Sequence, residues 1–263
     1  MPRQARKESG TGIYHVMLRG INRQDIFEEA EDYMRMLSCL QQMLEQYDDQ
    51  GNRLPPLCTF YAYCLMSNHV HLLLRVNQED IGSTIKHLAV MYAIYYNQKY
   101  SRSGHVFQDR FKSEPVNDMQ YFVTLLRYIH QNPVKAGIVE HVKDYEYSSW
   151  GEYDGTVEPV FQLCDTGTVL RRVPFDDLEA MVNEPLADEV NCLDMDDPSR
   201  SRPSDDQVWA YIKDKTGVTN SSAFQRLNDD IRRAVLKNLK EIGASHRQLA
   251  RLTGIGRGVI QKL

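Results

Sequence analysis

The sequence lacks several features that would assign its class at once. It has no apolar run close to the roughly 20 residues that a membrane-spanning helix needs. Its basic N-terminus is not followed by the apolar segment of a secretory signal peptide, which predicts a cytoplasmic protein. The five cysteines include no C-x-x-C pair, so we interpret them as reduced thiols rather than as disulfides or zinc ligands.

The chain also lacks the overall positive charge that is typical of nucleic-acid-binding proteins, because its formal net charge is -5. The charge is unevenly distributed. Residues 1–155 hold 16 Lys and Arg against 19 Asp and Glu, residues 156–199 hold 2 against 11, and residues 200–263 hold 13 against 6. A basic end favours nucleic-acid binding there, although a solvated basic helical face would give the same counts.

The pattern of expected elements divides the chain into three parts. Residues 1–155 read as strands and amphipathic helices in the order β-α-β-β-α-β-α, which predicts an α+β fold: a ferredoxin-like antiparallel sheet with helices on one face. Residues 156–204 are acidic and weakly periodic, and we interpret them as a linker with short helices. Residues 205–263 predict a C-terminal all-helical domain, whose end, HRQLARLTGIGRGVIQKL, is typical of a helix-turn-helix or of a plain helical hairpin.

Two histidines stand in the most informative stretch, residues 61–76, YAYCLMSNHVHLLLRV. We expect two strands here, joined by a tight turn at Ser67 and Asn68. Successive side chains of a strand point to opposite faces, so His69 and His71 share one face. Two neighbouring imidazoles on a strand can bind one divalent cation, but two half-buried structural histidines would show the same pattern.

A third expected helix, from Met119 to about Gln131, carries a tyrosine and two amides. Tyr128 stands three residues before Gln131 and four before Asn132, and such neighbours lie on one face of a helix. We expect the helix to end there, because Pro133 disfavours helical backbone at the preceding residue. A tyrosine hydroxyl can be a covalent nucleophile when a cation polarises the phosphoryl group under attack. A core aromatic residue and a helix C-cap are the simpler readings.

Four segments in this order resemble a known family: YHVMLRGINRQDIF, SNHVHLLLRV, GHVFQDRFKSEPV and YIHQNPVKAGIV. Together they resemble the single-tyrosine transposases of the HUH endonuclease superfamily. The first segment is similar to the REP-associated branch, which serves bacterial repetitive extragenic palindromes. Ser67 stands where that pattern has proline and Phe107 where it has tryptophan, and these departures concern the turn and the packing.

The resemblance implies metal-dependent cleavage and strand transfer of single-stranded DNA hairpins at palindromic repeats. Tyr128 matches the nucleophile that forms a 5′-phosphotyrosine link. His69 and His71 match the metal ligands, and Asn132 matches the third ligand, with Gln131 in reserve. The implied cofactor is a divalent metal, Mg²⁺ or Mn²⁺. Relatives of this kind act as monomers or as homodimers, so use of the tyrosine within its own chain or on a partner stays open.

Basic and amide side chains gather near the first expected turn and on a fourth expected strand, residues 105–116. Basic groups supply salt-dependent affinity for phosphate backbones, although each could be an ordinary surface residue. Our candidates for contacting DNA are Arg19, Asn22, Arg23, Arg110 and Lys112.

Two other functions fit part of the same pattern. A DNA-binding regulator could keep the transposase fold and act through the C-terminal helix-turn-helix. A metal-dependent hydrolase could cleave without a covalent step. The complete set of His69, His71 and Tyr128 favours the transposase, and trapping a covalent DNA adduct would separate it from both alternatives.

Overall fold

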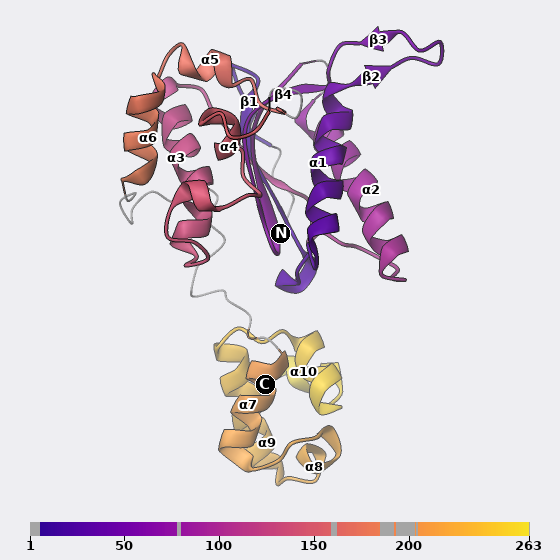
Figure 1. The fold of residues 1–263 in the computed structure, drawn as a ribbon. Helices are drawn as coiled ribbons and strands as arrows, with labels where there is room; N and C mark the ends of the chain where they lie inside the picture. The colour runs from indigo at the N-terminus through magenta and orange to yellow at the C-terminus, as the bar shows by residue number, and fades with distance from the viewer. Residues whose placement is uncertain are drawn as a thin grey trace. The chain divides into compact units, whose positions relative to one another are not determined.

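The computed structural model describes residues 6–77, 80–158, 162–184, 192, 203 and 205–262. The chain divides into two compact units, Met1–Leu193 and Asp194–Leu263 (Figure 1). The first unit thus extends beyond residue 155, where the expected linker begins. No helix in the described ranges is both long and apolar enough to span a membrane.

An antiparallel sheet in the order β4-β5-β1-β6 forms the centre of the first unit. The strands are β1 (Ile13–Arg19), β4 (Cys58–Met66), β5 (His69–Val76) and β6 (Lys112–Pro115), and a separate ribbon holds β2 (Gln46–Tyr47) and β3 (Arg53–Leu54). The helices are η1 (Ile21–Arg23), α1 (Ala30–Leu44), α2 (Ile81–Lys99), α3 (Met119–Lys135), η2 (Val142–Asp144), α4 (Trp150–Tyr153), α5 (Thr166–Leu170) and α6 (Phe175–Asn183). The order β1-α1-β4-β5-α2-β6 is ferredoxin-like, which confirms the α+β class.

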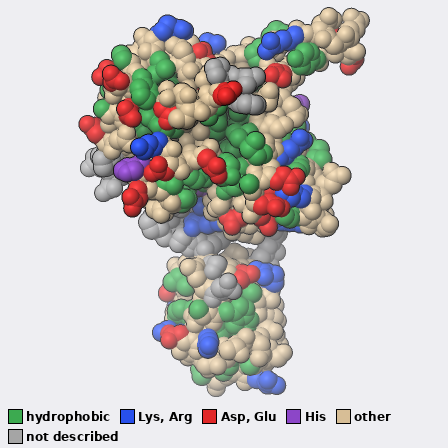
Figure 2. Space-filling view, viewed as in Figure 1, with side chains coloured by type: hydrophobic (Ala, Val, Ile, Leu, Met, Phe, Trp, Pro, Cys, Tyr) green, Lys and Arg blue, Asp and Glu red, His purple; other side chains and the backbone are tan. Residues whose placement is uncertain are grey.

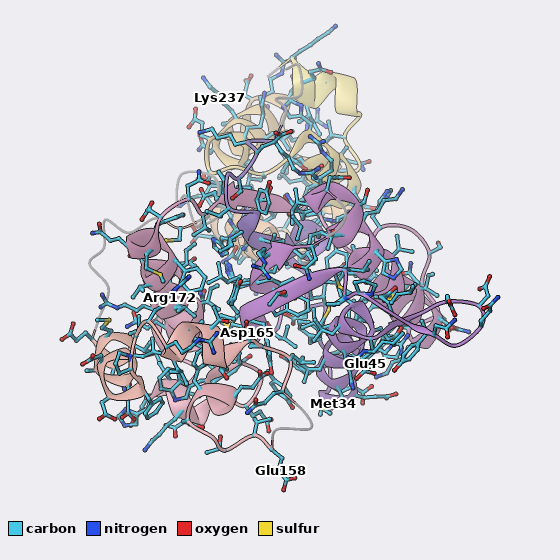
Figure 3. The ribbon with its side chains drawn as sticks, turned by 90° about the horizontal axis from the view of Figure 1, so that it is seen from above. Met34, Glu45, Glu158, Asp165, Arg172 and Lys237 are labelled. Carbon is cyan, nitrogen blue, oxygen red and sulfur yellow. The ribbon has the colours of Figure 1, made fainter. Side chains whose placement is uncertain are left out.

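Helices cover both faces of this sheet, so the expectation of helices on one face is wrong in that detail (Figure 1). Leu72 and Leu74 of β5 pack in one core with α1 and α2, while Leu73 packs in a second core with α3. Seen from above, Met34 and Glu45 of α1 lie on one side of the first unit and Arg172, just after α5, on the other (Figure 3). The nearly continuous apolar runs of β4 and β5 reflect burial on both faces.

The fourth strand is shorter than expected, since β6 covers only Lys112–Pro115. Asp109 has a φ of 52°, in the left-handed region, and this turn separates β6 from the isolated bridge that Phe107 forms with Gly20. Arg110 therefore precedes the strand, and the expectation that it lies on the same strand as Lys112 is wrong.

The third helix continues through Pro133 to Lys135, so the expected end near Gln131 is also wrong. A proline removes one hydrogen bond of the helix. Here the Asn132 side chain donates to the Tyr128 carbonyl oxygen at 2.8 Å, and the Ala136 amide donates to the Asn132 carbonyl oxygen at 3.0 Å. These bonds and the burial of Pro133 hold the helical turn around the proline.

Two short helices, α5 and α6, occur within the segment expected to be a linker, residues 156–204. Leu178 and Val182 of α6 are fully buried in the core that α3 shares. This burial explains why the first compact unit includes them. Residues 159–161, 185–191, 193–202 and 204 of the expected linker lie outside the described residues.

The second unit is helical, as expected. Its helices are α7 (Asp205–Thr216), α8 (Ser221–Gln225), α9 (Asp229–Glu241), α10 (His246–Thr253) and α11 (Arg257–Gln261). Ser245 caps α10 by accepting a hydrogen bond from the Gln248 amide at 3.1 Å, and Gly254 ends that helix with a φ of 70°. Leu249 and Ile260 join α10 and α11 to the small core of this unit.

Candidate functional site

The sheet face beneath α3 carries the two histidines of β5. In the antiparallel pairing of β1 with β5, Arg19 lies opposite His69 and Met17 lies opposite His71. Lys112 of β6 lies opposite Met17 on the other side of β1. Directly opposite residues have their side chains on the same face. The register therefore places Arg19 and Lys112 on the face of the histidines.

Tyr128 packs from α3 onto these histidines. Its ring centroid lies 5.5 Å from that of His71 and 5.9 Å from that of His15, both in edge-to-face geometry, and the rings of His69 and His71 are 5.0 Å apart. Tyr128 is 2% exposed. The Asp118 carboxylate fixes the start of α3 by accepting a hydrogen bond from the backbone N–H of the third helical residue. The structure thus brings together three residues that the sequence singled out.

Each histidine of β5 has its Nδ1 engaged. His69 Nδ1 donates to Asn68 Oδ1 at 2.6 Å, and Asn68 Nδ2 donates to the Arg23 carbonyl oxygen at 3.3 Å. His71 Nδ1 lies 3.0 Å from His15 Nε2. Metal-binding histidines commonly use one ring nitrogen for the ion while the other is held by a hydrogen bond. The two rings therefore fit a divalent cation bound through Nε2.

The surroundings of His71 favour the neutral form of its imidazole. Burial lowers the pKa of His71 well below its usual value, and the nearby His69, His15 and Arg19 lower it further. A histidine binds a metal ion in its neutral form. Burial and these neighbouring groups therefore favour the neutral imidazole, which is the form that binds a cation.

The two candidates for a third ligand make different contacts. Gln131 Nε2 donates to the carbonyl oxygens of Val182, at 2.6 Å, and of Glu184, at the end of α6. Asn132 is half-buried, one turn after Tyr128 on the same helix. Within the described ranges no three His, Cys, Asp or Glu side chains form a group that could hold a metal ion. Asn132 Nδ2 in turn donates to the Tyr128 carbonyl oxygen. Both side chains carry an amide oxygen, a ligand type that a hard divalent cation accepts.

The turn after β1 lies against the β4–β5 turn that precedes His69. The Gly20 amide donates to the Asn68 carbonyl oxygen at 2.8 Å, and Asn22 and Arg23 take left-handed φ values of 54° and 61°. A Cβ atom at Gly20 would lie 2.1 Å from the Gln24 carbonyl oxygen, so this close approach requires glycine. The geometry places Asn22 and Arg23 near the histidines, as expected.

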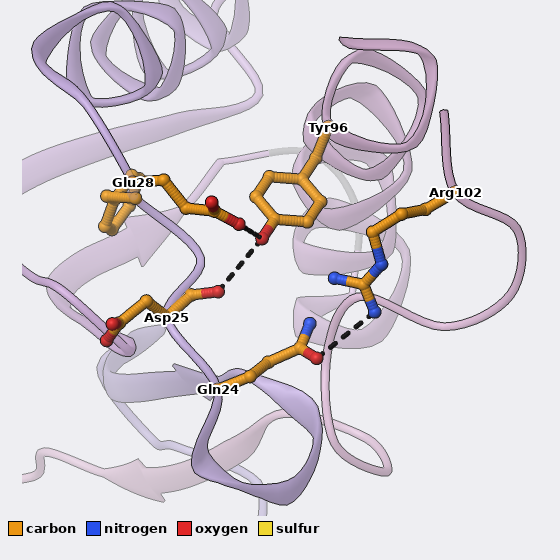
Figure 4. Close-up of a pocket in the computed structure, with 6 residues that line it drawn as sticks. Gln24, Asp25, Glu28, Tyr96 and Arg102 are labelled. Carbon is orange, nitrogen blue, oxygen red and sulfur yellow. Dashed lines mark hydrogen bonds between the residues drawn. The ribbon is translucent and has the colours of Figure 1, made fainter. Parts of the chain in front are cut away.

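A pocket of about 470 Å³ lies along the segment that leads from η1 to α1 (Figure 4). Tyr96 of α2 donates to Glu28 Oε1 at 2.5 Å and lies 3.1 Å from the Asp25 carbonyl oxygen, while Arg102 donates to Gln24 Oε1 at 3.1 Å. These bonds attach the segment to α2. None of the predicted site residues lines this pocket.

Surface charge indicates the position of the candidate site less clearly than these contacts do. Asp and Glu side chains are spread over the face of the first unit in view, mixed with Lys and Arg (Figure 2). The candidate cations Arg110 and Lys112 are exposed, whereas Arg19 and Arg23 are half-buried beside the histidines. Charge on its own would therefore not have located the site.

Sequence reasoning assigned no role to His15, Asn68 or Lys135. His15 shares a strand face with Arg19 by simple alternation, but only the pairing of β1 with β5 brings it to His71. Lys135 stands seven residues after Tyr128 on α3, and its Nζ lies 5.9 Å from the Tyr128 ring centroid. That spacing of two helical turns is the one signal that could have pointed to Lys135.

The described geometry, a histidine pair on a ferredoxin-like sheet with a tyrosine packed over it, agrees with comparisons to known proteins. Residues 9–132 match the model of the family described as "Transposase IS200 like". This part of the chain is therefore similar to the IS200-like transposases. A protein of Haemophilus influenzae described as a REP-associated tyrosine transposase is 34% identical over 101 residues, which cover 34% of this chain and 57% of that protein. This relative confirms the resemblance to the REP-associated branch, and the chain spans somewhat more than half of its length.

Two solved structures are also similar to this chain. One is a REP-associated tyrosine transposase bound to a REP hairpin, with 16% identity, a TM-score of 0.48, and coverage of 63% of this chain and 93% of that one. The other is described as a transposase of Deinococcus radiodurans, with 17% identity, a TM-score of 0.31, and coverage of 49% and 97%.

Proposed function

We propose that the first unit cleaves single-stranded DNA at palindromic hairpins and transfers the cut strand through a 5′-phosphotyrosine intermediate. The observation that carries this proposal is the Tyr128 ring packed 5.5 Å from His71, with His69 beside it. Two similarities support the choice of DNA as substrate: that of residues 9–132 to the IS200-like transposases, and that of the chain to the Haemophilus influenzae protein. An enzyme acting on chromosomal repeats in a bacterium would work in the cytoplasm.

His69, His71 and Asn132 are the proposed metal ligands, with Mg²⁺ or Mn²⁺ as the ion. When bound, the ion would polarise the scissile phosphate and stabilise charge on the leaving oxygen. The chain contributes fixed positions: β5 presents two imidazoles, and α3 presents the amide one turn beyond the tyrosine. Holding nucleophile and phosphate in one orientation supplies much of the rate of such reactions.

Tyr128 is the proposed nucleophile. Its Oη forms a bond to phosphorus while the bond from phosphorus to the 3′ oxygen breaks, and the phenolic proton is balanced by the proton gained at the new 3′-hydroxyl. One phosphodiester is exchanged for another, so a second 3′-hydroxyl can reverse the step and join a new strand without an external energy source. Lys135, 5.9 Å from the Tyr128 ring, adds positive charge beside the phosphate.

The tyrosine is proposed to act in its own chain. Support comes from Tyr128 and His71 of one chain being in direct ring contact. A monomer would then be sufficient for cleavage, and a homodimer would contain two complete sites. Arg19, Asn22, Arg23 and Lys112 would bind the DNA around the site, and Arg110, which precedes β6, would contact DNA further along.

The experiment that tests this proposal is incubation with single-stranded palindromic repeats and Mg²⁺, followed by a denaturing gel. A protein–DNA band that survives denaturation, together with a fragment ending in a 3′-hydroxyl, is the expected result. Cleavage without such a band would indicate hydrolysis by a metal-bound water. Binding without cleavage would favour the DNA-binding regulator.

The second unit is proposed to add DNA affinity rather than chemistry, through the α10–α11 pair as a helix-turn-helix. A chain ending at Leu193 keeps α5 and α6, which pack with α3, and should still cut a minimal hairpin. We expect it to bind longer DNA about tenfold more weakly at moderate salt, because it loses several phosphate contacts. Fluorescence anisotropy over a salt titration measures this difference. Equal affinity of the two chains at every salt concentration would remove the role.

A further inference from the structure

We propose that His15 is a positioning residue that holds His71 in the tautomer and orientation that present Nε2 to a cation. His15 Nε2 lies 3.0 Å from His71 Nδ1, and the rings stack with centroids 5.2 Å apart and planes inclined by 22°. Both side chains are buried, at 0% and 2% exposure. The inference rests on the proposed metal site and concerns a residue outside its ligand set.

The contact between the two rings is a hydrogen bond with a definite direction. Two ring nitrogens at 3.0 Å share one proton, so one of them donates and the other accepts. If His71 Nε2 binds a cation, His71 Nδ1 carries the proton and donates it to His15 Nε2. His15 must then carry its own proton on Nδ1. The reverse arrangement would place a proton on His71 Nε2 and block the ion.

His15 is well placed to impose this choice, because its backbone is fixed on both sides. In the sheet it lies opposite Leu73 of β5 and opposite Glu114 of β6. Its neighbour on the same face, Met17, lies opposite His71 and is 5% exposed. A buried side chain on a central strand has little freedom to rotate, so the acceptor nitrogen stays at one position.

His15 also contacts the nucleophile's ring. The Tyr128 and His15 centroids are 5.9 Å apart at an interplanar angle of 71°, and Tyr128 contacts His71 in the same way. His69 has a different support, since its Nδ1 donates to Asn68 in the adjacent turn. The two proposed ligands are thus oriented by different elements, His71 by β1 and His69 by the turn between β4 and β5. Removing such outer partners commonly weakens metal binding by about 10- to 100-fold.

The first test measures Mn²⁺ binding to the full chain without DNA, by calorimetry or by electron paramagnetic resonance. His15→Leu should weaken binding by at least about tenfold. His15→Gln, whose Oε1 can accept from His71 Nδ1, should recover most of the affinity. Met17→Leu alters packing on the same strand face and keeps the acceptor, so it should change affinity by less than about twofold. Wild-type affinity in His15→Leu would overturn the inference.

The second test needs no substitution. Nitrogen-15 NMR of the metal-free wild-type chain reports which ring nitrogen of His71 carries the proton. We expect the proton on Nδ1, and a proton on Nε2 would overturn the inference even if the variants failed to fold. If the wild-type chain formed no DNA adduct while His15→Leu weakened Mn²⁺ binding, the proposed function alone would be overturned. Absence of Mn²⁺ binding to the wild-type chain would overturn both.

Discussion

Tyr128→Phe should form no covalent adduct with DNA and should lose cleavage by more than about 10⁴-fold. The substitution removes one oxygen atom and keeps the ring, so the edge-to-face contacts with His15 and His71 remain. Binding of single-stranded DNA and of Mn²⁺ should stay within about twofold of wild type, because neither depends on the hydroxyl in this mechanism. A denaturing gel of end-labelled hairpin DNA measures both the adduct and the cut strand.

Tyr121→Phe is the matched control, since Tyr121 lies two turns earlier on the same helix. Its hydroxyl donates to Glu114 Oε2 at 2.7 Å, and burial together with this bond raises the pKa of Tyr121. A phenol held in its protonated form by a carboxylate is a poor nucleophile. We expect adduct formation to persist in this variant. If Tyr121→Phe abolished the adduct and Tyr128→Phe kept it, the assignment of the nucleophile would be wrong.

His69→Ala should abolish cleavage in buffer that has been freed of metal and then supplied with Mg²⁺. His69 begins β5 and is half-buried, so its removal should leave the fold intact, with a change in unfolding free energy of about 1 kcal/mol or less. Loss of one of the three proposed protein ligands should raise the metal concentration needed for cleavage beyond the millimolar range. Single-turnover cleavage of a labelled hairpin over a Mg²⁺ titration measures the effect.

His87→Ala supplies the comparison for that variant. His87 is an exposed histidine on α2, the helix that packs on the opposite face of the sheet, and its loss should leave cleavage unchanged. His71→Ala should also abolish cleavage, but it empties a buried position and should lower stability as well. A normal cleavage rate for His69→Ala would mean that the metal site lies elsewhere.

The elements that the sequence predicted well are those whose pattern is local. Alternation in the run HVHLLLRV places His69 and His71 on one strand face, and Ser67 and Asn68 form the predicted turn. The spacing from Tyr128 to Asn132 places both on one helix, as found. Such features depend on neighbours within a few residues along the chain.

The features that the sequence did not reveal depend on tertiary contacts. His15 and His71 are 56 positions apart in the sequence, and their contact arises from the register in which β1 pairs with β5. Pro133 stays inside α3 because packing and the Asn132 side chain outweigh the local preference for a helix end. The packing of α6 against α3 was missed because its segment has weak periodicity, which gave no sign that Leu178 and Val182 are core residues.

The attachment of α3 to its surroundings has a consequence for how activity depends on protein concentration. His130 Nε2 lies 2.8 Å from Ser149 Oγ, and Arg127 and Gln131 donate to the backbone at the end of α6. Exchange of α3 alone between two chains would break these bonds and expose its buried stripe. With Tyr128 acting in its own chain, as proposed, the cleavage rate should scale with the first power of protein concentration, so that a few copies in a cell would suffice.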